Sequence, residues 1–388
     1  MLVVAATGLL GMALWFTGSA ISADLQTRWD LTTGERAWLT SAVQIGFVVG
    51  TAVAAVLNLA DVLPARTYVA GATLLATLCN LAVLLSPSFA GTAWARFGTG
   101  FFLAGVYPPL MKMLATWFRA ERGFAIGALV AALTLGQATP YLVRALGDAD
   151  LVLVISSAGS LLAAALIFFA YRGGPFAFPR APFSWSLVAE VARHRETRLA
   201  TGGYLGHMWE LYAMWAWLPA FAVASAAAWS ARTGNPFDEA GATLLASAAI
   251  MFGGFGALWG GFVADRRGRE WTVNVAMFAS GLCAVAVGFA FGLSPWILAP
   301  LLLAWGFFII ADSAQFSALV TEVAPAHAVG TALTLQTSVG FLLTMATVQG
   351  VPLLAARVGW QWSFAVLALG PWAGIFAMRT LARRRRTA

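Results

Sequence analysis

Long apolar runs separated by short polar stretches fill almost the whole chain. Each run is about 20 residues long, the length that an α-helix needs to cross a bilayer. The twelve runs cover residues 2–23, 37–57, 67–86, 90–117, 123–144, 150–171, 201–227, 239–263, 271–292, 295–320, 328–350 and 354–379. Lipid cannot hydrogen-bond to exposed backbone, and the runs are too long for the alternating strands of a β-barrel. The pattern therefore predicts an all-α integral membrane protein with twelve transmembrane helices.

Composition supports this prediction, because 60% of the residues are hydrophobic and only 10% are charged, against roughly a quarter in soluble domains. The two cysteines, Cys79 and Cys283, lie in separate apolar runs, so no disulfide framework is expected. No basic region precedes the first run, and we expect that run to stay as a helix rather than to be cleaved as a signal peptide.

The arginines are distributed unevenly between the loops on the two sides of the predicted bundle. Five lie in one set of loops, at 28, 36, 144, 232 and 357, and sixteen lie in the other, at 66, 119, 122, 172, 180, 193, 195, 198, 266, 267, 269, 379 and 383–386. The positive-inside rule then predicts an inner (cytoplasmic) membrane protein with both termini in the cytoplasm. Topology and anionic lipid account for the net charge of +7, so no nucleic-acid partner is expected.

A polar segment divides the chain into two parts. We expect an amino-terminal six-helix half at 1–171, a cytoplasmic linker at 172–200, a carboxyl-terminal six-helix half at 201–380 and a basic tail at 381–388. Within the linker, Trp185, Val188, Val191 and Ala192 recur at helical spacing, which predicts a short helix on the membrane surface.

The two halves carry matching features in the same order. Gly100-Phe101-Phe102 returns as Gly306-Phe307-Phe308 at an offset of 206, and the loop Asp61–Arg66 returns as Asp265–Arg269 at an offset of 204. Such a repeat indicates duplicated halves, a build in which transporters bind solute between the halves and rock one half against the other.

Two motifs carry a resemblance to a known family. The segment Gly261–Arg269 resembles the G-x-x-x-D-R-x-G-R loop of the major facilitator superfamily, and Arg96–Gly100 is similar to that superfamily's R-x-x-x-G signature on helix 4. The resemblance covers essentially the whole chain and implies two pseudo-symmetric six-helix bundles. The loop between helices 2 and 3 departs from the pattern, with Leu57, Val62 and Pro64 in place of glycine, arginine and glycine.

The same resemblance implies a pair of gate loops at the cytoplasmic side. In the superfamily the loop aspartate meets the amino end of a helix from the other half, which would place Asp61 near helix 11 and Asp265 near helix 5. A helix amino end attracts an anion, so such contacts would hold the gate shut. The other residues assigned to the gate loops are Arg66, Gly261, Arg266, Gly268 and Arg269. The alternative is that these arginines only obey the positive-inside rule.

Four titratable residues fall well inside the predicted spans: Arg96 and Lys112 on helix 4, Glu210 on helix 7 and Asp312 on helix 10. Each costs on the order of 3 kcal/mol to insert, so each needs a partner or a water-filled cavity. The resemblance implies that helices 1, 4, 7 and 10 line a central cavity, and we expect the bases and acids to face each other across it. Structural ion pairs, such as Lys112 with Asp312, and a packing role for Arg96 are the alternatives.

Other candidate contacts share helix faces with these charges. His207 lies on the face of Glu210, Gln315 lies on the face of Asp312, and Trp15, Tyr107 and Tyr212 supply an aromatic wall. Desolvation favours the neutral form of a mid-membrane carboxylate, which makes Glu210 a candidate proton carrier. The three histidines are scattered over separate segments, so no metal site and no cofactor are expected.

These features favour a secondary transporter over an enzyme, because no phosphate loop, nucleophile–base pair or metal-ligand cluster is recognisable. We expect a monomer that moves a small polar organic solute, an anion or a zwitterion, coupled to protons by alternating access. The alternatives are a multidrug/proton antiporter, although Gly136–Pro140 does not match the superfamily's G-P-x-x-G-G run on helix 5, and a non-transporting receptor.

Overall fold

The structure, a computed structural model, describes residues 1–118, 122–176 and 184–387; the side chains of Asp61, residues 122–124 and residues 386–387 lie outside the described part. The chain is 87% helical, and the described residues contain no strand. In chain order the helices are α1 (Leu2–Met12), α2 (Thr17–Ala20), α3 (Ser22–Trp29), α4 (Thr33–Val56), α5 (Leu59–Val62), α6 (Ala65–Ala82), α7 (Phe89–Leu103), α8 (Tyr107–Ala115), α9 (Arg122–Leu146), α10 (Ala149–Ala170), α11 (Trp185–Arg193), α12 (Arg195–Thr233), α13 (Glu239–Arg267), α14 (Arg269–Ala290), α15 (Pro295–Ala311), α16 (Ser313–Val323), α17 (Val329–Val358), α18 (Trp360–Ser363) and α19 (Leu369–Thr387), with 3-10 turns η1 (Ala326–Ala328) and η2 (Ala365–Ala368).

Nine helical segments of the described chain are long and apolar enough to cross a membrane. The other three predicted spans correspond to α1–α3, to α6 and to α7–α8, which are broken or less apolar. The all-α membrane fold is therefore confirmed, and the helices are consistent with the predicted count of twelve.

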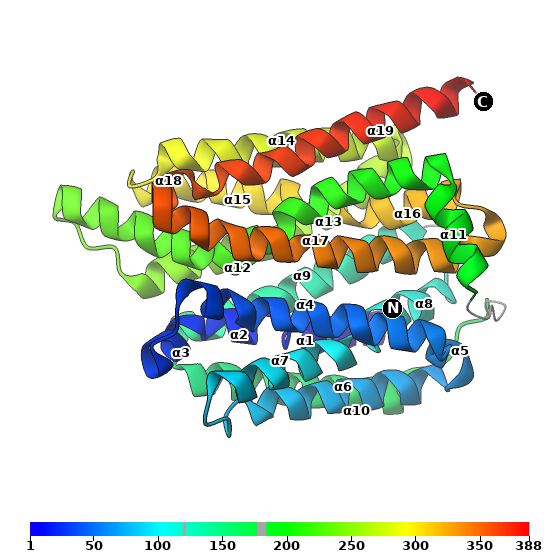
Figure 1. Ribbon diagram of the computed structural model, residues 1–388, viewed down its shortest axis with the longest axis horizontal. Coiled ribbons are helices and arrows are strands. Elements are labelled where there is room, and N and C mark those ends of the chain that lie inside the picture. Colours follow the sequence, from blue (N-terminus) through cyan, green and yellow to red (C-terminus); the bar gives the residue numbers. More distant parts are fainter. Residues whose placement is uncertain (119–121, 177–183, 388) are drawn as a thin grey trace.

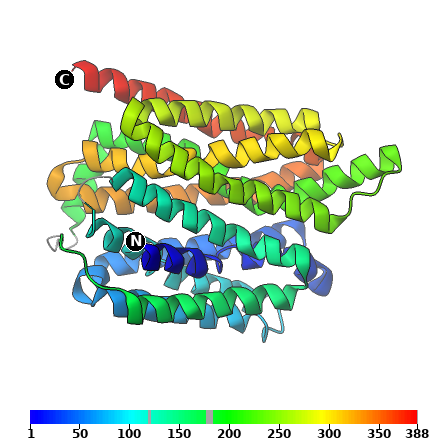
Figure 2. The ribbon, with the colours of Figure 1, turned by 180° about the vertical axis from the view of Figure 1, so that it is seen from behind.

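The helices form two groups that lie side by side. Figure 1 shows α1–α10 in the lower part of the view and α12–α19 in the upper part, with α11 at one end between them. The groups meet along two helix pairs, α9 with α13 and α4 with α17, and Figure 2 shows α9 running beside α13. We call the end of the bundle that carries α5, α11 and the carboxyl terminus the basic end, and the end that carries α3 and α18 the opposite end.

Three of the predicted spans are interrupted near their middle, which the sequence-based prediction of unbroken helices at 2–23, 90–117 and 295–320 missed. The first breaks between Met12 and Thr17, the fourth between Leu103 and Tyr107, and the tenth at Asp312. The break between Leu103 and Tyr107 has a clear cause. Two prolines occupy the first turn of α8, and proline cannot supply the N–H of a continuing helix.

The same close glycine contact occurs once within each of the two groups. A Cβ on Gly100 would lie 1.9 Å from the carbonyl oxygen of Val43, and a Cβ on Gly306 would lie 1.8 Å from that of Ala249. Both pairs are related by 206 residues, so α7 approaches α4 as α15 approaches α13. Small residues permit such close backbone contact in membranes. The sequence repeat is thus also a repeat of packing.

Two helices extend beyond the predicted apolar runs. In the seventh span, α12 runs from Arg195 to Thr233, beyond the predicted 201–227 at both ends, and the division of the chain into two halves and a linker stays a prediction. The last span does not begin at 354, because α17 continues to Val358 and the chain turns at Gly359. The short linker helix predicted around Trp185 is confirmed as α11, which buries Val191.

Candidate functional site

A cavity lies between the two helix groups, near the middle of the bundle. Its volume is about 50 Å³, room for one or two water molecules. The lining comes from α1, α8, α9, α12, α15, α16 and α17, and consists of Met12, Tyr107, Val130, Leu133, Thr134, Gln137, Tyr204, Met208, Leu211, Tyr212, Trp215, Ile310, Ser313, Ser317, Thr337 and Phe341. None of these side chains is charged at neutral pH. The wall thus combines hydroxyl, amide and indole groups with apolar surface.

An aromatic cluster closes this central cavity on the side of the opposite end. The ring centroid of Trp15 lies 5.6 Å from that of Tyr212, 5.2 Å from that of Phe341 and 5.1 Å from that of Phe47. Phe16 stacks on Tyr212 at 5.9 Å. Since Trp15 and Phe16 belong to the break after α1, while Tyr212 and Phe341 belong to α12 and α17, the cluster joins the two groups.

Glu210 is buried inside the α12–α19 group rather than at the cavity wall. Its Oε1 accepts a hydrogen bond from Trp305 Nε1 at 2.6 Å, and its Oε2 accepts one from Ser280 Oγ at 2.9 Å. The residue as a whole is 1% exposed. The three residues come from α12, α14 and α15, so this network lies wholly within one group.

Asp312 lies at the junction of α15 and α16, and its partner is a histidine. His207 Nδ1 is 2.9 Å from Asp312 Oδ1, and both side chains are 2% exposed. The ring of His207 packs at 5.3 Å from that of Phe316. Neither Asp312 nor His207 lines the central cavity. The structure therefore brings together the predicted residues Asp312 and His207, one turn of α12 from Glu210.

Arg96 is fully buried in the α1–α10 group, where its guanidinium hydrogen-bonds to residues in and beside the break after α1. Its Nη2 donates to the carbonyl oxygens of Leu14 at 2.9 Å and Trp15 at 2.6 Å, and its Nη1 donates to Thr17 Oγ1 at 2.6 Å and Asn80 Oδ1 at 2.8 Å. A broken helix leaves carbonyl oxygens without N–H partners, and in lipid these must be satisfied within the protein. Arg96 supplies the donors, which agrees with the packing alternative.

The remaining predicted residues fall at several places. Tyr107 and Tyr212 line the central cavity. Trp15 is buried just beyond it. Gln315 accepts a hydrogen bond from Arg269 Nη1 at 2.7 Å. Lys112 is half-buried on α8. Arg96, Glu210 and Asp312 do not face each other across one cavity, because each of these three is bound within its own helix group.

The gate-loop residues lie at the basic end. Arg269 Nε donates to Glu322 Oε1 at 2.6 Å, Arg66 lies over the ring of Phe168 at 5.8 Å, and Arg266 lies over the ring of Phe262 at 3.8 Å. Gly268 has a positive φ of 90° and separates α13 from α14, a conformation that glycine adopts without strain.

The predicted partners of the two loop aspartates are only partly visible. A Cβ on Gly127 of α9 would lie 3.1 Å from the carbonyl oxygen of Ala257 and 3.9 Å from the Cα of Gly261. Asp265, one turn beyond Gly261 on α13, is exposed. The side chains of residues 122–124 and of Asp61 lie outside the described part, so both aspartate contacts stay predictions.

Sequence reasoning missed most of the cavity lining. Tyr204, Met208 and Leu211 recur at helical spacing along α12, a stripe that could have been read as one face. These residues carry no charge, so a pattern of charged positions does not reveal them.

Comparisons with known proteins agree with this architecture. The family model of the major facilitator superfamily matches residues 3–348. A solved structure titled as a bacterial homologue of the human lysosomal transporter Spinster, in an inward-facing and unoccupied conformation, superposes with a TM-score of 0.73 and 13% sequence identity over 98% of this chain and 97% of that one. At this identity the likeness concerns the fold alone. No protein of curated function matches in sequence. Because the family model spans most of the chain, this protein belongs to the major facilitator superfamily and is a multi-pass membrane protein of the secondary transporter class.

Proposed function

We propose that the protein carries a small polar organic solute by alternating access, with the solute bound in the central cavity. The observation that supports this is the composition of the wall: both helix groups contribute to it, and its polar groups include Tyr107, Gln137 and Ser313. Small-molecule sites typically have a small number of polar groups set in an apolar surface. At about 50 Å³ the cavity is too small for most solutes, so binding requires the two groups to move apart.

The uncharged wall favours a solute without net charge. The expectation of an anion rested on charges facing the cavity, and Glu210, Asp312 and Arg96 are bound elsewhere. The indole Nε1 of Trp215 is buried and has no hydrogen-bond partner among the described residues. An unsatisfied buried donor costs about 1–3 kcal/mol, which an acceptor on the solute would relieve. We therefore propose a neutral or zwitterionic solute with an acceptor group and an apolar face.

Proton coupling is the second part of the proposal, and Glu210 and Asp312 are its carriers. Both acids are buried, and both have polar partners that tolerate a change of charge: two donors for Glu210 and an imidazole for Asp312. They lie on the helices that also line the cavity, α12 and the α15–α16 junction. A change in their protonation would thus alter packing at helices that contact the solute.

The experiment begins with a thermal-shift screen of metabolites and drugs at two pH values, because a ligand stabilises the protein that binds it. Transport of each hit is then measured in proteoliposomes over a pH series for the native protein, Glu210→Gln and Asp312→Asn. Glu239→Gln, an exposed acid in the first turn of α13, is the matched control. We expect the pH dependence to flatten in the first two variants only. If both retain the native profile, coupling through these acids is wrong.

One observation favours drug efflux as a second candidate function. The wall carries adaptable and aromatic surface, with Met12, Met208, Trp215 and Phe341, and methionine is common at promiscuous binding surfaces. Thermal shifts with many unrelated amphipathic compounds, rather than with one group of metabolites, would favour this candidate.

The proposed orientation places the basic end in the cytoplasm, following the positive-inside rule. We propose an inner-membrane location and a monomeric carrier. Labelling of a cysteine introduced at Arg385 in sealed, right-side-out vesicles tests the orientation, since a membrane-impermeant reagent should not reach it there.

A further inference from the structure

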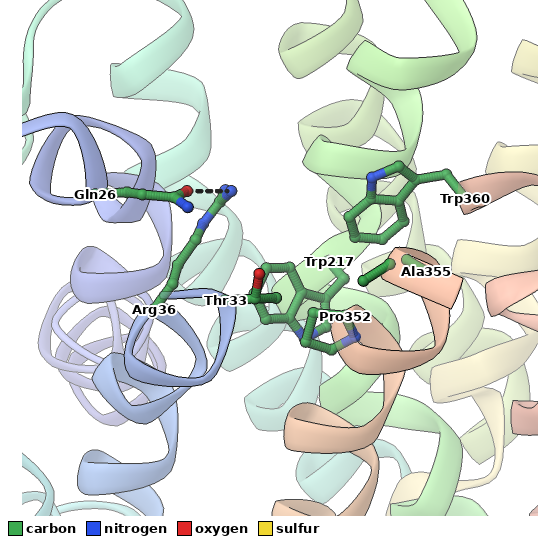
Figure 3. A pocket seen from close by; sticks show the side chains of 8 residues that line it. Gln26, Thr33, Arg36, Trp217, Pro352, Ala355 and Trp360 are labelled. Carbon is green, nitrogen blue, oxygen red and sulfur yellow. Dashed lines mark hydrogen bonds between the residues drawn. The ribbon is translucent and has the colours of Figure 1, made fainter. Parts of the chain in front are cut away.

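A second cavity, of about 190 Å³, opens between the two helix groups at the opposite end. Figure 3 shows Gln26 and Arg36 on one side of it and Trp217, Pro352 and Trp360 on the other. The first two residues belong to α3 and α4, and the others to α12, α17 and α18. This outer cavity is larger than the central cavity and is separate from it, with no lining residue in common.

Among the described residues that line the outer cavity, Arg36 alone carries a charged group. Its Nε donates to Ser22 Oγ at 2.9 Å, and its Nη1 donates to Gln26 Oε1 at 3.2 Å. Both acceptors are neutral. A guanidinium has five N–H donors, so these two bonds leave three donors for a ligand.

The acids nearest in sequence are engaged elsewhere. Asp24 accepts two hydrogen bonds from Arg144, at 2.9 and 3.0 Å. Glu35 accepts from the backbone N–H and the hydroxyl of Thr32, at 2.9 and 2.7 Å. Within the described residues, no carboxylate lies within ion-pair distance of Arg36. Asp24 and Glu239 lie within electrostatic reach of Arg36, but among the described residues no carboxylate forms an ion pair with it.

Two indoles form the facing wall. The Arg36 guanidinium lies 5.3 Å from the ring centroid of Trp217, and the rings of Trp217 and Trp360 are 6.1 Å apart. Trp217 is fixed because its Nε1 donates to the carbonyl oxygen of Val348 at 2.8 Å. A cation beside a flat apolar wall suits a planar group that ends in a carboxylate, which an arginine fork can bind through two parallel hydrogen bonds.

We propose that the outer cavity is a binding site for a small organic monocarboxylate, distinct from the central cavity. Its volume equals that of about six liquid water molecules, which admits one ring or a short chain with its carboxylate. The carboxylate lies on Arg36, and the apolar part of the ligand lies against Trp217 and Trp360.

Occupation of this site opposes opening at the opposite end. Arg36 and Trp217 belong to different helix groups, and Gln349 Nε2 donates to Ser41 Oγ across the same boundary at 3.0 Å. A ligand that contacts both groups binds only while they are together. By mass action it increases the population of that conformation, so it acts as an inhibitor from this side of the membrane.

The test uses the full-length protein in detergent, with benzoate as the probe and benzamide as its uncharged counterpart. Binding is followed by calorimetry and by the unfolding temperature. Arg36→Gln removes the charge, and Ala356→Phe narrows the cavity without touching the arginine. Arg28→Gln is the matched control, because Arg28 also lies over an indole, that of Trp29 at 5.6 Å, yet lines no part of the cavity.

We expect benzoate, but not benzamide, to bind the native protein and Arg28→Gln, and affinity to fall at least about tenfold in Arg36→Gln and Ala356→Phe. Benzoate should also slow alkylation of Ser41→Cys, a fully buried position, in a background without Cys79 and Cys283. Equal affinity in Arg36→Gln and Arg28→Gln overturns the proposal, as does an absence of binding to the native protein up to about 10 mM. The measurement does not depend on transport, so it stands or fails separately from the proposed function.

Discussion

Replacing Arg96 by glutamine tests whether this residue holds the break after α1. The guanidinium makes four hydrogen bonds of 2.6–2.9 Å. A hydrogen bond inside a membrane protein contributes about 0.6 kcal/mol on average, so four of them give about 2–3 kcal/mol. The carbonyl oxygens of Leu14 and Trp15 would also be left without these donors. We expect Arg96→Gln to lower the free energy of unfolding by this amount, and Arg96→Lys to lower it by less.

The assay is unfolding by sodium dodecyl sulfate in mixed micelles, followed by circular dichroism. Arg144→Gln is the matched control, since Arg144 binds Asp24 at 2.9 Å but both side chains are about a third exposed. A partly exposed ion pair of this kind contributes about 0–1 kcal/mol to the free energy of unfolding. Equal destabilisation by Arg96→Gln and Arg144→Gln would refute the reasoning, because it would mean that burial and the four acceptors do not decide the effect.

Two further predictions concern packing and the gate. Gly260→Ala should destabilise the protein by about 1–3 kcal/mol, because the new Cβ would lie 1.7 Å from the carbonyl oxygen of Ala311, whereas Gly330→Ala meets nothing within 4 Å and should be tolerated in the same unfolding assay. Asp265→Asn should favour the inward-open conformation by weakening the contact expected at the amino end of helix 5. A cysteine at Ser317 on the cavity wall should then be alkylated faster from the basic end; an unchanged rate contradicts this.

The sequence predicted the helices well because lipid imposes a minimum length of apolar chain on each span. It did not predict the break at residues 13–16, where no proline occurs. Arg96, far away in sequence, donates to the carbonyl oxygens of Leu14 and Trp15 at that break. The sequence also did not predict toward which neighbours the polar side chains inside the membrane point. Glu210 and Tyr212 are two residues apart, yet one contacts Ser280 and Trp305 and the other lines the central cavity. Only packing decides the rotation of a helix about its axis.

The length of α12 has a mechanical consequence. Its 39 residues measure about 58 Å along the axis, nearly twice the hydrocarbon thickness of a bilayer, so at least one of its ends extends beyond the hydrocarbon layer. Pro219 interrupts its hydrogen bonding after Trp215, the last residue of α12 that lines the central cavity. From Pro219 to Thr233 the helix is a rigid arm of about 21 Å, and a bend of about 20° at the proline swings the tip by about 7 Å. That bend would move a segment that packs on its own helix group through Phe221 and Ser225, while the part of α12 that lines the central cavity would stay in place.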